Sequence, residues 1–195
     1  MRRIVAIAIA IAALSLWVVP AQATDQLVPG KIFLMKPQKL AKVIAKPISP
    51  AVFALPAPGN SPLIKPWAIW FKWFNVWFHF PLPSPNWKGL GNPPGSKGYK
   101  YKGDGTLADP CKVVLVKPKL VKGICKGPTL TPDPPHPGTV PIQVGAADVS
   151  DRYCAEFGGT EIRNDASLLK RKDAPAPASC ASPSGAFVDD SSGLF

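Results

Sequence analysis

The sequence predicts an all-β protein made of two tandem, small β-sandwich-like modules that derive from an internal duplication and are stapled by disulfides. The main observation is a repeat: the stretch KIFLMKPQKLAKVIAKP, residues 31–47, returns at residues 112–128 as KVVLVKPKLVKGICKGP, with nine identical positions once one gap is allowed. Internal repetition outranks local motifs as a guide to architecture. The 25 prolines and 16 glycines also favour short strands over long helices, because proline removes a backbone donor.

The first element is a secretory signal peptide at residues 1–23. Arg2 and Arg3 precede an apolar run at residues 4–19, and the small residues of Ala21-Gln22-Ala23 form a cleavage-like site. An uncleaved membrane anchor would need about 20 apolar residues, more than this run supplies. We therefore expect cleavage near Ala23, a mature chain without a transmembrane span, and a secreted protein, either periplasmic or extracellular.

The repeated stretch is expected to form a β-hairpin in each copy. Residues 111–116 and 120–125 are mainly apolar on both alternating faces, which indicates strands that are partly buried on both sides. Pro37 and Pro118, each set between lysines, are expected at the tight turns. A proline-rich connection then leads to another short apolar strand, at residues 49–55 in the first copy and 140–144 in the second.

These elements define the expected domain organisation. One β module spans residues 24–105 and a second, which contains the cysteines, spans residues 106–180. The modules are expected to pack together, because either one alone would have a thin core. The tail at residues 181–195 is rich in serine and glycine and has no periodicity, so we expect it to be disordered.

One segment, WAIWFKWFNVWFHF at residues 67–80, contains four of the six tryptophans of the chain. A pair of core strands is one interpretation, since aromatic residues favour strands. A helix lying in a membrane interface is another, because one helical stripe would hold the small or polar residues Ala68, Lys72, Asn75 and His79. A sugar-stacking surface is the third. The fourth is a local frameshift, because the composition changes abruptly at both ends of the segment.

The even number of cysteines predicts disulfides rather than reactive thiols. An exported chain meets an oxidising compartment, where two disulfides are expected from the residues Cys111, Cys125, Cys154 and Cys180. Four cysteines allow three pairings. We favour Cys111 with Cys125, which flank the second hairpin, and Cys154 with Cys180. The first hairpin has Gly30 and Ala45 in the equivalent places.

Four motifs resemble those of a family of exported bacterial proteins with no known activity. They are GLGNPPGSKGYKYKG (89–103), DPCKVVLVKP (109–118), DRYCAEFGG (151–159) and LKRKDAPAPASC (169–180). The similarity covers residues 86–180 well and residues 25–63 more loosely. It implies secretion and a repeated β module, but no activity, cofactor or site residue. In that family the region equivalent to residues 67–80 is a polar strand pair, so this chain departs from the family there, which favours the frameshift.

Charge is the clearest indication of function. Residues 31–126 contain sixteen lysines, no arginine and two acids, a net charge of +14. Lysine is a hydrated point charge without the planar fork that reads phosphates and base edges, so sequence-specific nucleic-acid recognition is not expected. Attraction to an anionic polysaccharide or a membrane surface fits better. The alternative is that these lysines only keep strand edges soluble and unpaired.

The sequence contains no recognisable catalytic, cofactor or metal site. The loop GNPPGSKG, residues 91–98, lacks the Walker pattern, and its two prolines remove backbone donors. No C-x-x-C motif accompanies His79 or His136, and neither histidine has an evident nucleophile or orienting acid. Carboxylate pairs of the kind used on glycosides are conceivable for Asp104 with Asp109 and for Asp151 with Glu156.

These observations predict a secreted, non-enzymatic structural or interaction protein without a cofactor. The first alternative is an extracellular binding module for anionic glycans or envelope lipids that uses lysines of the two hairpins: Lys36, Lys39, Lys42, Lys117, Lys119 and Lys122. The second alternative is a hydrolase. The sequence does not predict an oligomeric state.

Overall fold

The computed structural model describes residues 24–127, 133–183 and 187–189 and confirms the all-β fold. These residues form fourteen strands and two short 3-10 turns, η1 (Pro58–Asn60) and η2 (Ser84–Asn86), with no α-helix among them. The predicted signal peptide at residues 1–23 lies outside the described residues.

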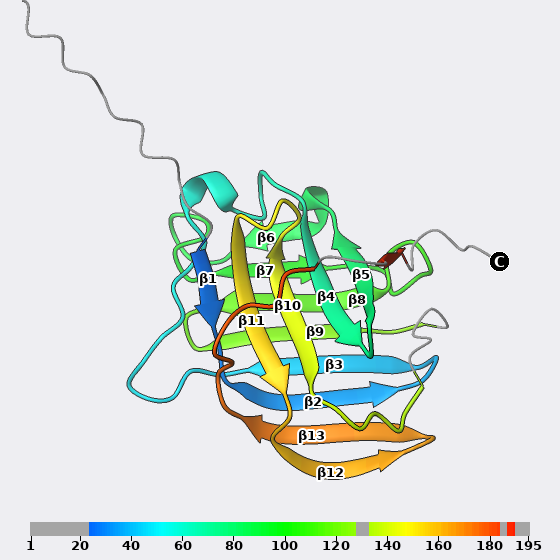
Figure 1. The fold of residues 1–195 in the computed structure, drawn as a ribbon. Helices are drawn as coiled ribbons and strands as arrows, with labels where there is room; N and C mark the ends of the chain where they lie inside the picture. The colour runs from blue at the N-terminus through cyan, green and yellow to red at the C-terminus, as the bar shows by residue number, and fades with distance from the viewer. Residues whose placement is uncertain (1–23, 128–132, 184–186, 190–195) are drawn as a thin grey trace, which may run out of the picture.

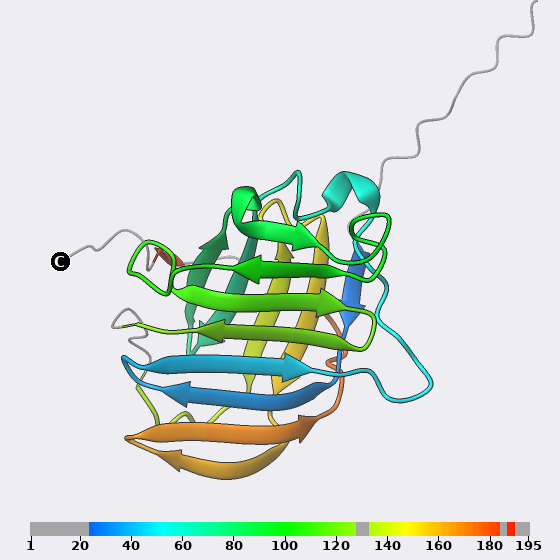
Figure 2. The ribbon, with the colours of Figure 1, turned by 180° about the vertical axis from the view of Figure 1, so that it is seen from behind.

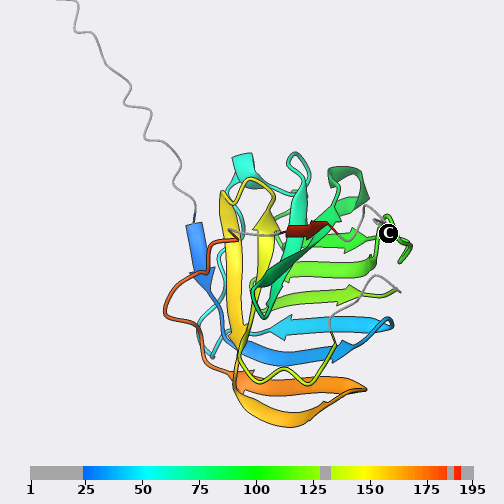
Figure 3. The same cartoon turned by 45° about the vertical axis from the view of Figure 1, so that its right-hand side comes forward.

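The strands form two sheets that face each other, with the strands of one sheet running across those of the other (Figures 1 and 3). The six-stranded sheet has the order β1 (Thr24–Leu27), β11 (Asp151–Phe157), β10 (Val140–Ala146), β4 (Trp67–Trp73), β5 (Val76–Leu82) and β14 (Phe187–Asp189). The eight-stranded sheet has the order β12 (Thr160–Asp165), β13 (Leu168–Ala174), β2 (Gly30–Lys36), β3 (Leu40–Ala45), β9 (Leu120–Cys125), β8 (Cys111–Lys117), β7 (Tyr99–Lys102) and β6 (Trp87–Gly89).

The two repeated hairpins, β2–β3 and β8–β9, lie side by side in the eight-stranded sheet, joined by antiparallel pairing of β3 with β9 (Figure 2). Val43 pairs with Gly123, its equivalent in the repeat, and the pairing continues symmetrically on either side. Ala41 faces Cys125 and Ala45 faces Val121. The two hairpins are therefore related by an approximate two-fold axis through the pair Val43 and Gly123.

The segments 24–105 and 106–180 share both sheets. Strand β1 pairs with β11, β2 pairs with β13 and β10 pairs with β4, so each of these ladders joins the first segment to the second. One continuous core between the sheets contains residues of both segments, among them Phe33, Trp67, Val116 and Phe157. The boundary at residue 105 does not separate two packing units.

The aromatic segment forms the hairpin β4–β5, which confirms the core-strand interpretation. Trp67, Phe71 and Phe80 are each at most 2 % exposed and belong to the main core. On the opposite face of the hairpin, Trp70 and Trp77 are also buried and pack with Ala181. The helical interpretation is wrong, and the rings are too deeply buried for a sugar-stacking surface. Packing on both faces is not expected of an out-of-frame segment.

Two further expectations differ from the structure. Residues 49–55, predicted as a strand, form a loop, because Pro47, Pro50 and Pro56 cannot donate to a ladder. In the tail, residues 187–189 form strand β14, which pairs in parallel with β5. The remaining tail residues at 184–186 and 190–195 lie outside the described residues.

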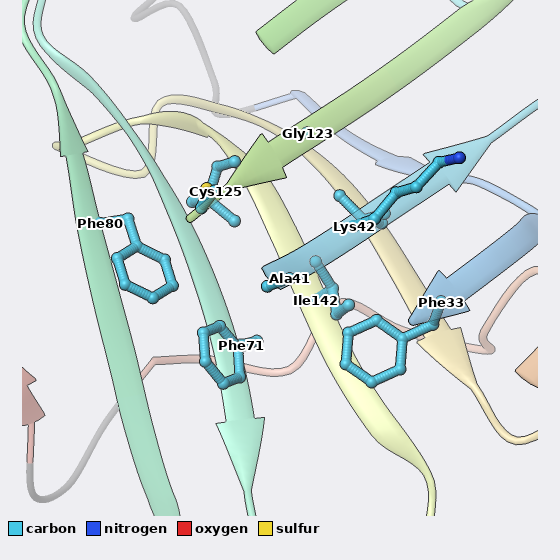
Figure 4. Close-up of a pocket in the computed structure, with 10 residues that line it drawn as sticks. Phe33, Ala41, Lys42, Phe71, Phe80, Gly123, Cys125 and Ile142 are labelled. Atoms are coloured by element: carbon cyan, nitrogen blue, oxygen red, sulfur yellow. The ribbon is translucent and has the colours of Figure 1, made fainter. Parts of the chain in front are cut away.

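A small apolar cavity of about 20 Å³ lies where the two hairpins meet the six-stranded sheet (Figure 4). Phe33, Phe71, Phe80 and Ile142 line it, while the Lys42 side chain leads away from these rings. A space of this size holds about one water molecule, so it is a packing defect rather than a ligand site.

Both disulfides follow the favoured pairing, Cys111 with Cys125 and Cys154 with Cys180. Cys111 and Cys125 face each other across β8 and β9, as the hairpin predicted. The second bridge ties the segment that follows β13 to the outer side of β11. This segment covers Trp70 and Trp77, so the bridge closes the second apolar cluster.

Candidate anionic-ligand interface

The outer face of the eight-stranded sheet, whose strands are seen in Figure 2, carries many lysines. On the four central strands, β2, β3, β9 and β8, buried side chains such as Phe33, Val43 and Val114 point into the core. Their neighbours in sequence point outward and are lysines or half-buried aliphatic residues. These four strands contain no acidic residue.

Four lysines form one diagonal row across this face. Lys42 directly faces Ile124, and Lys122 lies two residues from Ile124 on the same strand, so Lys42 and Lys122 are diagonal neighbours. The same relation joins Lys36 to Lys42 across β2 and β3, and Lys122 to Lys117 across β9 and β8. Diagonal neighbours lie about 7–8 Å apart. The row therefore carries one positive charge on each of four adjacent strands.

Two more pairs of lysines flank the row. Lys170 and Lys172 lie on β13 beside β2, and Lys100 and Lys102 lie on β7 beside β8. They face equivalent positions of the two hairpins, so all eight lysines follow the approximate two-fold symmetry. Sequence reasoning did not assign these four lysines to the site, because the pairing of β13 with β2 cannot be read from spacing.

Two acids with exposed side chains at the β12–β13 edge of this face form ion pairs. Asp173 forms an ion pair with Lys31, and Asp165 forms one with Arg163. Hydrogen bonding to Lys31 lowers the pKa of Asp173 below its usual value, so this carboxylate stays charged. Both acids are thus occupied by cations other than the eight lysines.

The lysine stems cover an aliphatic surface. The outward-facing apolar residues of the four central strands are half-buried: Ile32, Leu34, Leu40, Ile44, Val113, Leu115, Leu120 and Ile124. Lysine side chains extend their methylene groups along such a surface and keep the ammonium group in water. The face therefore has charged groups above an apolar floor.

The structure separates the predicted turn lysines into two groups, because β3 and β9 are antiparallel. The turn of β2–β3, with Lys36 and Lys39, lies at one end of the sheet, and the turn of β8–β9, with Lys117 and Lys119, lies at the other (Figure 2). The other two predicted lysines, Lys42 and Lys122, lie within strands on the diagonal row. The six residues therefore share a face but not a single turn cluster.

A shallow pocket of about 540 Å³ lies at the β2–β3 end of the face. It is lined by the turn residues Lys36, Pro37, Gln38 and Lys39 and by residues of the β12–β13 hairpin, Arg163, Ala166, Ser167 and Leu168. This pocket brings two predicted lysines next to Arg163, which sequence spacing did not indicate. It offers a partly enclosed place for one anionic group at the end of the row.

One acid of each candidate carboxylate pair makes structural contacts. Asp151 and Glu156 lie five residues apart on β11, so they point to opposite faces of the sheet, and Asp151 is buried and accepts a hydrogen bond from the Ala57 N–H at 3.2 Å. Asp109 accepts hydrogen bonds from the Tyr101 hydroxyl at 2.7 Å and from the Asp104 N–H at 3.2 Å, which is a loop-fixing role.

The histidines have structural surroundings. His136 is buried, its Nε2 accepts a hydrogen bond from the Phe74 N–H at 3.1 Å, and its Nδ1 lies 2.9 Å from the Gly138 carbonyl oxygen. Both ring nitrogens are thus within hydrogen-bond distance of backbone groups. The His79 ring lies tilted beside Trp70, with ring centroids 5.7 Å apart.

Two buried arginines were missed by sequence reasoning. Arg171 donates to the backbone carbonyls of His136, at 2.6 Å, Gly138 and Phe157, and forms an ion pair with Glu161. Arg152 forms a two-pronged ion pair with Asp25, at 2.8 and 2.7 Å. These contacts join distant segments, so the arginines stabilise the fold rather than bind a ligand.

Among the described residues, one group of potential metal ligands comes close together: Asp25, Cys154 and Cys180. The two cysteines form a disulfide, and Arg152 occupies the carboxylate. This group therefore does not offer the free thiolates that a metal ion requires.

The part of the chain described by the structure contains no helix long and apolar enough to cross a bilayer. Comparisons of the chain with protein-family models, with curated proteins and with solved structures found no match. The resemblance to a family of exported proteins stays a prediction.

Proposed function

We propose that this chain is an exported, non-enzymatic interaction protein that binds an anionic partner of the cell envelope through the outer face of the eight-stranded sheet. The observation that carries the proposal is a symmetric group of eight lysines on that face, centred on the row Lys36, Lys42, Lys122 and Lys117. The four central strands carry no acid to oppose them. A partner with repeated phosphate or carboxylate groups would meet a matching charge on each strand.

Electrostatics determines what kind of binding this face supports. Exposed lysines are compact hydrated charges, so the attraction is diffuse and falls as salt screens it. Each lysine near an anionic surface contributes about 1 kcal/mol, so the four lysines of the row together supply about 4 kcal/mol. This is enough for reversible attachment and does not require a deep pocket.

The proposal includes export of the chain and an origin of its two hairpins by duplication. Two disulfides form and persist in oxidising compartments, which supports a protein that works outside the cytosol. The symmetric pairing about Val43 and Gly123 supports an origin by duplication of one hairpin, because two identical hairpins pair most simply about a two-fold axis. Duplication would then have doubled the lysines on one face.

The proposal is tested with the mature chain, residues 24–195, on immobilised heparin as a model polyanion. The variant K42Q/K122Q removes two charges from the row, and K72Q/K97Q removes two charges from outside the central strands of the face. Lys72 lies on β4 in the other sheet, and Lys97 lies in the loop between β6 and β7. We expect the row variant to bind about 30-fold more weakly and to elute at lower salt, while the matched control changes little.

Equal losses in the two variants would show that net charge alone attracts the polyanion and would overturn the proposed face. Absence of binding by the parent chain at physiological salt would leave the lysines with a solubilising role only. Thermal unfolding of each variant, monitored by circular dichroism, separates loss of binding from loss of fold.

A further inference from the structure

The loop that follows β3 carries an unusual apolar tip. Residues 48–52, ISPAV, are all exposed, with Ile48 74 % and Val52 57 % accessible to solvent. The loop extends beyond the end of the eight-stranded sheet (Figure 2). The tip contains no charged residue, although exposed loops are usually polar. Neighbouring exposed apolar residues that are rimmed by polar groups are typical of surfaces that contact a protein or a membrane.

The base of the loop is held firmly. Phe53 is buried, and its N–H donates to the Pro118 carbonyl at 2.8 Å, which ties the loop to the β8–β9 turn. Ala54 exchanges two hydrogen bonds with the Gln26 side chain, and its carbonyl also accepts the Tyr153 hydroxyl at 2.6 Å. The tip is therefore presented on a fixed base, so little ordering of the loop is required on binding.

Lysines lie near the base of this tip. Lys46 lies at the start of the loop and is exposed, and Lys119 is exposed on the β8–β9 turn that Phe53 contacts. Lys117, the last residue of the diagonal row, belongs to the same turn. The acid at this end, Asp173, is paired with Lys31. An exposed aliphatic tip with lysines near its base thus lies at the end of the basic face.

We propose that this end of the molecule docks on an anionic lipid bilayer, with Ile48 and Val52 inserted among the headgroups and with Lys46, Lys117 and Lys119 against lipid phosphates. The inference rests on the proposed affinity for anionic partners and narrows the partner to a membrane surface. A flat polysaccharide offers charges but no apolar layer for the tip. A bilayer interface offers both, and burial of apolar side chains adds to electrostatic attraction there.

The test is co-sedimentation of the mature chain with vesicles of phosphatidylcholine alone or with about 30 % phosphatidylglycerol, in the anionic range where basic clusters bind. The tip variant is I48S/V52S. Its matched control is I64S/L107S, which changes two exposed aliphatic residues, 65 % and 48 % accessible, on other loops. We expect the parent to bind the anionic vesicles, the tip variant to bind them about tenfold or more weakly, and the control to bind as the parent does.

Heparin binding, measured in parallel, separates the two proposals. Loss of vesicle binding by I48S/V52S with unchanged heparin binding supports the bilayer inference. Equal vesicle binding by parent and tip variant overturns it, as does heparin binding without any vesicle binding, and both results leave the proposed function intact. Absence of both activities in the parent overturns both proposals. If the parent chain forms a dimer without lipid and I48S/V52S is a monomer, a second copy of the chain covers the tip. That result would also overturn the bilayer inference.

Discussion

Lys42 and Lys122, equivalent residues of the two repeated hairpins, are diagonal neighbours on adjacent strands of one sheet. Each directly faces an isoleucine of the other hairpin: Lys42 faces Ile124 and Lys122 faces Ile44. This arrangement keeps like charges apart by one diagonal step, which reduces their repulsion while the row remains continuous. The chain therefore carries a line of positive charge without placing two lysines directly opposite each other on β3 and β9.

A glutamate at position 124 would interrupt this line without removing a lysine. In I124E the new carboxylate directly faces Lys42 and neutralises it. We expect heparin binding about fivefold weaker than in the uncharged control I124Q, since one lysine contributes about 1 kcal/mol. Affinity chromatography in a salt gradient measures the difference. Identical elution of the two variants would contradict the role of Lys42 in binding.

Gly123 lies where the eight-stranded sheet packs closely against Ile69 of the other sheet. A Cβ atom at this position would lie 2.8 Å from Ile69 Cδ1 and 2.9 Å from Val43 Cγ1. We expect G123V to lower the free energy of unfolding by about 1–3 kcal/mol, because overpacking forces side chains from their rotamers. G59A is the control, since nothing lies within 4 Å of a Cβ there. Urea denaturation gives the comparison, and a neutral G123V would show that the sheets separate easily at this point.

Arg171 anchors the connection that precedes β10. Its guanidinium donates to three backbone carbonyls and to Glu161 while only 4 % of the residue is exposed. Lysine keeps the charge but cannot reach these acceptors from one planar fork. We therefore expect R171K to lower the free energy of unfolding by about 2–4 kcal/mol. The exposed control R163K should change it by about 0.5 kcal/mol or less. Similar denaturation midpoints for R171K and the parent would contradict this anchoring role.

Tyr153 is expected to make the free energy of unfolding decrease at alkaline pH. Burial raises the pKa of its hydroxyl above the usual value, and nearby Asp151 adds to this rise. The folded state therefore favours the neutral hydroxyl. The stabilisation that this gives to the fold is complete below the pKa of an unfolded tyrosine, about 10, and is lost as the pH rises above that value. At pH 11 we expect the parent to have lost about 1.4 kcal/mol more stability than Y153F. Guanidinium titrations at pH 8 and pH 11 measure this difference, and parallel curves would contradict it.

Much of the local structure was determined by the sequence alone. The alternation at residues 111–116 and 120–125 and the turn prolines predicted the β8–β9 hairpin, and that hairpin in turn brought Cys111 opposite Cys125. For the aromatic segment, core strands were one of four interpretations, and the structure selects that one, because bulky rings favour a pleated and buried surface. These predictions depend on contacts between residues close in sequence, where spacing specifies geometry.

Tertiary structure decided which of these elements became neighbours. Pairing of β3 with β9 placed the two hairpin turns at opposite ends of the sheet and aligned Lys36, Lys42, Lys122 and Lys117 in one row. Pairing of β13 with β2 added Lys170 and Lys172 to the same face. The buried arginines and the exposed tip at Ile48 likewise follow from long-range packing. Sequence periodicity fixes which side of a strand a residue occupies, but only the pairing of distant strands, driven by burial of a shared core, decides which charges meet.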